Sequence, residues 1–135
     1  MLHIRLVVVG GLRERYWEHA AAEYSKRMTK YCKFEVIEVK ETSQIRDKIK
    51  GHSILCDIQG TLVSSEEMAA KIAKISLTSS TITFIIGGSE GAGELSADER
   101  ISFGRATYPH QLFRVILTEQ IYRAFTIIKG EKYHK

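Results

Sequence analysis

The sequence contains no run of about 18 apolar residues, the length that a membrane-spanning helix needs. Its apolar start, residues 1–11, is interrupted by Arg5 and is followed by no small-residue cleavage site, so we expect a first strand rather than a signal peptide. Two cysteines are present, Cys32 and Cys56, too few for a disulfide scaffold and without metal-site spacing. We therefore expect a protein of the reducing cytoplasm without a membrane span.

Proline and sequence repetition are also scarce. Pro109 is the one proline, and the 135 residues contain no internal repeat, low-complexity tract or linker. Hydrophobic residues make up 44% and charged residues 27%, a balance that excludes a disordered tail or a fibrous repeat. We expect a single domain over residues 1–135, large enough to bury one core.

Sequence motifs for metals and nucleotides are missing too. The five histidines form no His-x-x-x-His pair, so we expect no metal site. The dinucleotide fingerprint and the Lys-Ser/Thr phosphate loop are absent. A flavodoxin-like nucleotide binder is disfavoured because Gly10-Gly11-Leu12 is too short for the phosphate-binding turn after a first strand.

Positive charge is concentrated in the last quarter of the chain. Residues 100–135 carry seven Lys or Arg and two acidic residues, a balance of +5, whereas the first 99 residues carry −1. A basic segment on a neutral body suits a polyanion such as nucleic acid. The alternative is that the excess charge serves solubility alone.

Hydrophobic periodicity predicts alternating strands and helices. Ser64 and Glu67 form a capping-box pattern that starts one of the helices. The pattern indicates an α/β domain with a mainly parallel sheet. The expected strands are residues 4–9, 34–39, 53–57, 81–86 and 103–106, and the expected helices are 13–30, 43–50, one from 64 past Ile75, 96–100 and 111–128.

The last expected helix is apolar over most of its circumference. Such a helix must be buried on more than one side, and one sheet covers only one side. We therefore expect a homodimer that buries Ile121 and Phe125 between two copies.

Two segments are candidates for chemistry. Gly87-Gly88-Ser89-Glu90-Gly91 follows an expected strand, where open α/β sheets bind ligands, although it could also be a plain tight turn. Ser89 imitates a nucleophile turn only faintly. The terminal Tyr133-His134-Lys135 is either a frayed tail or a segment that reaches into a partner subunit.

These segments resemble the RlmH family of methyltransferases. The resemblance is carried by Phe-Ile-Ile-Gly-Gly-Ser-Glu-Gly (84–91), by Tyr-Pro-His-Gln-Leu-Phe-Arg (108–114) with the helix that follows, and by Tyr-His-Lys (133–135). It also includes Val-Val-Gly-Gly-Leu-Arg-Glu-Arg-Tyr-Trp (8–17) and the turn at Asp57, so that it covers nearly the whole chain. The resemblance implies the SPOUT fold, an α/β methyltransferase fold with a C-terminal trefoil knot that works as a homodimer.

The resemblance also implies an activity. It is methyl transfer from S-adenosylmethionine to N3 of a pseudouridine in the helix-69 stem-loop of 23S rRNA, in the assembled ribosome. The alternative is a ribosome- or RNA-binding module that shares the fold and has lost methyl transfer.

The chemistry of this reaction suggests catalytic residues, and the family pattern implies the cofactor-binding ones. Catalysis falls to His134, as general base or base-contacting residue, to Tyr133, which would stack or pack, and to Arg114. Arg123 could also hold phosphate or the ring oxygens, although an ion pair with Glu119, four residues away, is the plainer explanation of this arginine. The implied cofactor-binding residues are Cys56, Gly87, Phe103, Gly104, Arg105, Ala106, Thr107 and Tyr108.

The sequence departs from the family pattern at two places. Lys40–His52 is shorter than the usual connection, which affects the segment where substrate RNA could dock. Cys56 stands where leucine is common, and its small, apolar character is compatible with adenine packing.

Overall fold

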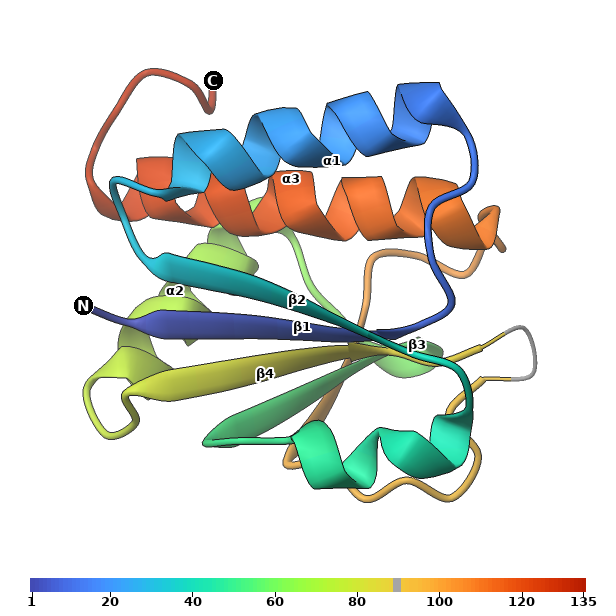
Figure 1. Cartoon of the computed structure of the whole chain (residues 1–135). Helices are drawn as coiled ribbons and strands as arrows, with labels where there is room; N and C mark the ends of the chain where they lie inside the picture. The colour runs from blue at the N-terminus through green and yellow to red at the C-terminus, as the bar shows by residue number, and fades with distance from the viewer. Residues whose placement is uncertain (89–90) are drawn as a thin grey trace.

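The chain folds around a five-stranded, fully parallel sheet (Figure 1). The structure is a computed structural model that describes residues 1–88 and 91–135. The strand order is β2-β1-β4-β3-β5, and this arrangement confirms the predicted α/β class. The strands are β1 (His3–Val9), β2 (Lys33–Val39), β3 (His52–Leu62), β4 (Thr81–Ile86) and β5 (Glu99–Ser102).

Three helices pack on one face of this sheet. They are α1 (Arg15–Met28), α2 (Ser65–Ser76) and α3 (His110–Ile128). The predicted capping box at the start of α2 is confirmed, because the Glu67 N–H donates to Ser64 Oγ at 3.0 Å and the Ser64 N–H donates to Glu67 Oε1 at 2.8 Å. The other face is covered by two short 3₁₀ helices, η1 (Thr42–Gln44) and η2 (Arg46–Lys48), and by residues 92–97.

The strands divide the core into two layers. Alternate residues of β1 point to opposite faces, so Ile4, Leu6 and Val8 meet the helices while Val7 points to the other side. The second layer is small and consists of Val7, Val39, Ile45, Leu55, Ile85, Ala92 and Leu95. The main core therefore lies between the sheet and the three helices.

The apolar character of α3 has an explanation within the single chain. This helix lies between α1 and α2 and packs on the sheet beneath them. Ile121 is fully buried and Phe125 is 6% exposed in one copy. The expectation that these two residues need a second copy to cover them is therefore wrong, and the homodimer stays a prediction without that support.

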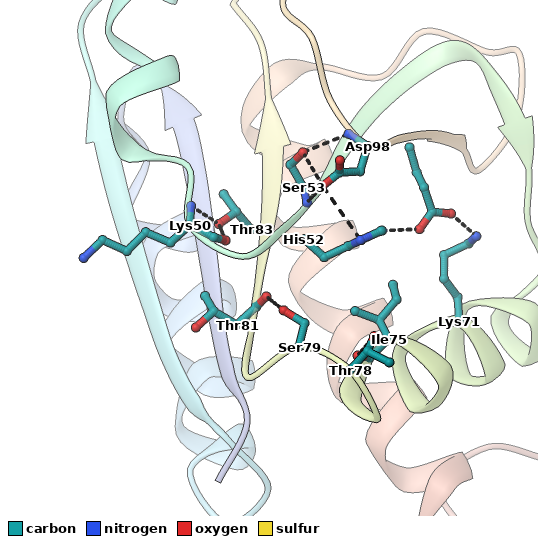
Figure 2. Close-up of polar contacts among 11 residues, drawn as sticks. Lys50, His52, Ser53, Lys71, Ile75, Thr78, Ser79, Thr81, Thr83 and Asp98 are labelled. Carbon is teal, nitrogen blue, oxygen red and sulfur yellow. Dashed lines mark hydrogen bonds and ion pairs between the residues drawn. The ribbon is translucent and has the colours of Figure 1, made fainter.

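Two other local predictions are also corrected. The expected helix 43–50 is a pair of 3₁₀ turns, and the expected helix 96–100 and strand 103–106 are replaced by one strand, β5, at Glu99–Ser102. Pairing with β3 decides the conformation of this segment more than its own hydrophobic pattern does. Ile101 enters the core, and the polar side chains beside it bind to residues of β3 and α2. Asp98 accepts bonds from the backbone N–H and Oγ of Ser53, and His52 and Lys71 lie beside this corner (Figure 2).

The short connection between β2 and β3 is held by polar side chains of the sheet. Arg5 donates to the carbonyl oxygen of Lys48 from two nitrogens, at 3.2 and 3.0 Å. Thr83 Oγ1 donates to the Lys50 carbonyl at 2.6 Å and accepts from the Lys50 N–H at 3.0 Å (Figure 2). These bonds satisfy polar side chains on a face where α/β sheets usually bury apolar ones under a helix.

Candidate active site

A cavity of about 650 Å³ opens at the carboxyl ends of β3 and β4. Its walls come from three separate segments, residues 55–58, 86–88 with 91–93, and 100–104 with 107–108, and from His110 and Phe113 at the start of α3. Ser89, which only faintly imitates a nucleophile turn, and Glu90 lie outside the described residues. The carboxyl end of a parallel sheet is the usual place for ligands in open α/β folds.

Most of the predicted cofactor residues reach this cavity. Its lining includes Cys56, Gly87, Phe103, Gly104, Thr107 and Tyr108. Arg105 and Ala106 are not part of the lining. Arg105 instead donates to the carbonyl oxygens of Ile58 and Gly60, the latter at 3.1 Å, and so ties the third segment to the first.

The glycine turn after β4 is closed by backbone packing. A Cβ atom on Gly87 would lie 2.5 Å from the carbonyl carbon of Gly91 and 2.6 Å from the nitrogen of Ala92, too close for any side chain. The carbonyl oxygen of Gly87 accepts a bond from His110 Nε2 at 2.8 Å. Gly87 is therefore needed for the turn itself, whatever it contributes to a ligand.

Two other glycines leave open space. Gly91 and Gly104 have φ values of +81° and +145°, which disfavour other residues, and no heavy atom lies within 4 Å of the position of a Cβ on either. Both line the cavity, so its wall is bare backbone at these points. Bare backbone lets a ligand approach peptide groups closely.

The rest of the lining is mainly apolar with one ion pair. Asp57 Oδ2 accepts from Arg100 at 3.0 Å, and Asp57 Oδ1 accepts from the Gln59 N–H at 3.0 Å. Burial raises the pKa of the Cys56 thiol to about 12, so it is neutral near pH 7 and serves as an apolar contact. Sequence reasoning left Asp57, Arg100 and His110 out of the site, although the position of Asp57 directly after Cys56 was an available signal.

The C-terminal tail forms a second polar group at the other end of α3. Tyr133 Oη donates to Glu119 Oε2 at 2.6 Å, and Arg123 donates to the same oxygen at 2.7 Å. The predicted Glu119–Arg123 ion pair is confirmed. The Arg123 guanidinium carbon lies 4.8 Å from the centre of the Tyr133 ring, and burial together with the Glu119 bond raises the pKa of Tyr133.

The same group holds His134. Arg123 lies 3.1 Å from His134 Nδ1, and because a guanidinium only donates, Nδ1 is the acceptor. Nε2 then carries the proton and faces Glu66 Oε2 at 3.4 Å. His134, Tyr133 and Arg123 are thus brought together, a grouping that the sequence analysis did not predict.

One copy of the chain does not join the tail to the cavity. His110 begins α3 at the cavity, and Arg123 lies thirteen residues further along the helix, about 20 Å at 1.5 Å per residue. Figure 1 shows the tail and the carboxyl end of β4 on opposite sides of the molecule.

Arg114 lies with neither group. Its side chain is 10% exposed and contacts Glu38 Oε2 at 2.6 Å. It lines a second cavity of about 380 Å³ between α1, β2 and α3. The predicted catalytic role of Arg114 therefore has no geometric support, whereas Arg123 does contact the tail.

Residues 1–88 and 91–135 contain neither a membrane-spanning helix nor a cluster of metal ligands. No helix there is both long and apolar enough to cross a membrane. In the same residues, no three His, Cys, Asp or Glu side chains are grouped so that they could hold a metal ion.

Comparisons with known proteins converge on one family. The family described as "Predicted SPOUT methyltransferase" matches residues 2–134. Proteins named "Ribosomal RNA large subunit methyltransferase H" from Limosilactobacillus reuteri, Clostridium botulinum and Pediococcus pentosaceus are 45%, 44% and 43% identical to the chain over 159 aligned positions. Each alignment covers 99% of this chain and 100% of the relative. Because 159 positions exceed the 135 residues of this chain, these relatives contain residues that it lacks.

Proposed function

Because the chain belongs to the RlmH family of SPOUT methyltransferases, we propose that it is an rRNA methyltransferase that uses S-adenosylmethionine. The substrate we propose is N3 of a pseudouridine in the helix-69 stem-loop of 23S rRNA, within the assembled cytoplasmic ribosome. The observation that carries the proposal is the convergence of Cys56, Gly87 and the 103–108 segment on one cavity.

The cavity suits this cofactor chemically. Leu55, Ile86, Ile101 and Phe103 offer apolar contacts for a flat heteroaromatic ring. The N–H groups of Thr107 and Tyr108 donate to no other residue that the structure describes, which leaves them for a ligand. The bare backbone at Gly91 and Gly104 gives room for close approach.

The chain's own residues then have to prepare the nucleophile. Bound S-adenosylmethionine supplies a methyl group that its sulfonium already activates, so the protein contributes alignment and proton transfer. His134 accepts the N3 proton of the uracil-type ring at Nδ1, the atom that contacts Arg123 in the free chain. Arg123 turns toward the ring anion that develops as the proton leaves, and Tyr133 stacks on the base.

The separation of tail and cavity favours a homodimer. A site that needs both groups cannot form in one copy when they lie about 20 Å apart along α3. We propose that the tail of one copy completes the cavity of the other. The trefoil knot that the family implies would be formed by the three segments that wall the cavity.

Methyl transfer to ribosomes tests the proposal. Ribosomes without the modification are incubated with the protein and S-adenosylmethionine carrying a labelled methyl group, beside free large subunits and naked rRNA. The expected result is label on one pseudouridine, in intact ribosomes above the other two substrates. Calorimetric titration separates an enzyme from a non-catalytic RNA-binding module, because absence of cofactor binding at millimolar concentration would contradict the enzyme.

A further inference from the structure

Positive charge gathers at the end of the molecule that carries the tail. Residues 26–33 contain Lys26, Arg27, Lys30 and Lys33 and no acidic residue. Residues 129–135 contain Lys129, Lys132 and Lys135 and one acidic residue, Glu131. We call these two segments together the basic end, and all seven of their Lys and Arg residues are exposed.

The two segments of the basic end form one continuous surface. Tyr31 Oη donates to Glu131 Oε2 at 2.8 Å, and Lys30 Nζ lies 3.5 Å from the same oxygen. The Tyr31 ring stacks on Phe125 of α3 with centroids 5.6 Å apart. Figure 1 shows the end of α1, the end of α3 and the tail together on one side of the molecule.

Aromatic rings lie among these charges. The Arg27 guanidinium lies 5.3 Å from the centre of the Tyr24 ring and 5.7 Å from that of Tyr122, and Lys30 Nζ lies 5.0 Å from that of Tyr31. Three exposed carboxylates lie at this surface: Glu131, Glu23, which pairs with Arg27 at 2.7 Å, and Glu66, which lies 3.4 Å from His134 Nε2. The seven basic residues therefore leave a large uncompensated positive charge, which suits the phosphate backbone of RNA.

We infer that the basic end is the surface that binds the phosphate backbone of the substrate rRNA stem-loop. The inference rests on the proposed function, because it is the tail, part of the basic end, that receives the target base. A base presented to His134 brings its flanking phosphates beside the lysines of residues 26–33. The basic end thus docks the RNA while the cavity of the partner copy holds the cofactor.

The connection between β2 and β3 is the competing surface. Residues 40–50 also carry exposed basic side chains, Lys40, Arg46, Lys48 and Lys50, but Glu41 and Asp47 lie among them. This segment covers the opposite face of the sheet from the helices. It supplies a matched control with similar exposed lysines.

Two triple variants separate the surfaces. One is Lys26→Gln, Lys30→Gln and Lys33→Gln, and the control is Lys40→Gln, Lys48→Gln and Lys50→Gln. Their affinity for unmodified ribosomes and for a synthetic helix-69 stem-loop is measured across a salt series, after circular dichroism has shown that both fold. Methyl transfer is followed in parallel.

The basic-end variant should bind RNA roughly tenfold or more weakly near physiological salt, and the slope of log affinity against log salt should fall by about two. The control should stay within about twofold of wild type. In methyl transfer the basic-end variant should raise KM for the ribosome and keep kcat. Wild-type affinity and salt slope in the basic-end variant, or a loss confined to the control, would overturn the inference.

The outcomes also separate this inference from the proposed function. If the basic-end variant binds RNA as wild type does and methyl transfer is normal, the proposed enzyme activity stands and the proposed docking surface is wrong. Salt-dependent binding through the basic end without any methyl transfer supports the docking surface and contradicts the enzyme.

Discussion

Arg114 and Glu38 form an ion pair in which the arginine is buried and the glutamate is half-exposed. The guanidinium lies 2.6 Å from Glu38 Oε2, yet the Arg114 side chain is 10% exposed and that of Glu38 is 48% exposed. The pair joins α3 to β2 beside α1. Removing the half-exposed partner strands a buried cation, whereas removing the buried partner leaves a carboxylate that water can reach.

This asymmetry predicts the stability of two variants. Arg114→Met should lower the free energy of unfolding by about 1–3 kcal/mol, and Glu38→Gln should cost more because it leaves the buried charge unpaired. Urea denaturation measures both. Methyl transfer by the folded Arg114→Met protein should stay near wild type, and a hundredfold loss of kcat at unchanged stability would restore Arg114 as a catalytic residue.

Gly87 predicts coupled losses of stability and cofactor binding. In Gly87→Ala the new Cβ would overlap the backbone of Gly91 and Ala92, so the turn must shift, at about 1–3 kcal/mol. The melting temperature should fall, and calorimetric titration should show a lower affinity for S-adenosylmethionine. Gly88→Ala is the control, since the nearest atom to its Cβ would be the side-chain atom Val9 Cγ1 at 3.3 Å; an equally large effect there would contradict the packing argument.

Glu99 predicts an acid-dependent contribution to stability. Burial alone would raise its pKa, but hydrogen bonds from Lys71 and His52 outweigh burial and hold the pKa below the ordinary 4.5. A lowered pKa stabilises the fold above pH 4.5, and that stabilisation is lost as the pH falls through the lower folded value. Glu99→Gln should therefore cost on the order of 1 kcal/mol near pH 7 and approach wild type in acid, below the lowered folded pKa.

Urea denaturation at both pH values checks this prediction. If the difference in unfolding free energy between wild type and Glu99→Gln is as large in acid as near pH 7, the charge of Glu99 does not account for its contribution to stability. A matched exposed site is Glu94, outside the strand, where Gln should change little at either pH.

The sequence predicted the strands β1 to β4 and the three long helices because each carries a clear hydrophobic period. It misplaced β5 because Glu99–Ser102 is short and polar, and its conformation depends on pairing with β3 and on His52 and Lys71. The interpretation of α3 failed for a related reason. Its two flanking helices come from distant segments, and periodicity within one helix does not reveal them.

The candidate site was predictable mainly through family resemblance. Composition and spacing pointed to Gly87-Gly88 and to a basic C-terminus, but not to the joining of residues 55–58 and 100–108 around one cavity. The position of Arg114 depended on helix phase. Arg114 and Phe113 are neighbours in sequence, yet one faces Glu38 and the other the cavity.

The composite site across the homodimer is tested most directly by mixing two inactive variants. Thr107→Arg places a bulky cation at the wall of the proposed cofactor cavity, and His134→Ala removes the proposed base, so each variant alone should transfer no methyl group to ribosomes. When the two are unfolded together and refolded, half of the dimers are mixed and each mixed dimer has one intact site, so about a quarter of wild-type activity should return. A mixture that contains mixed dimers but stays inactive would contradict the account.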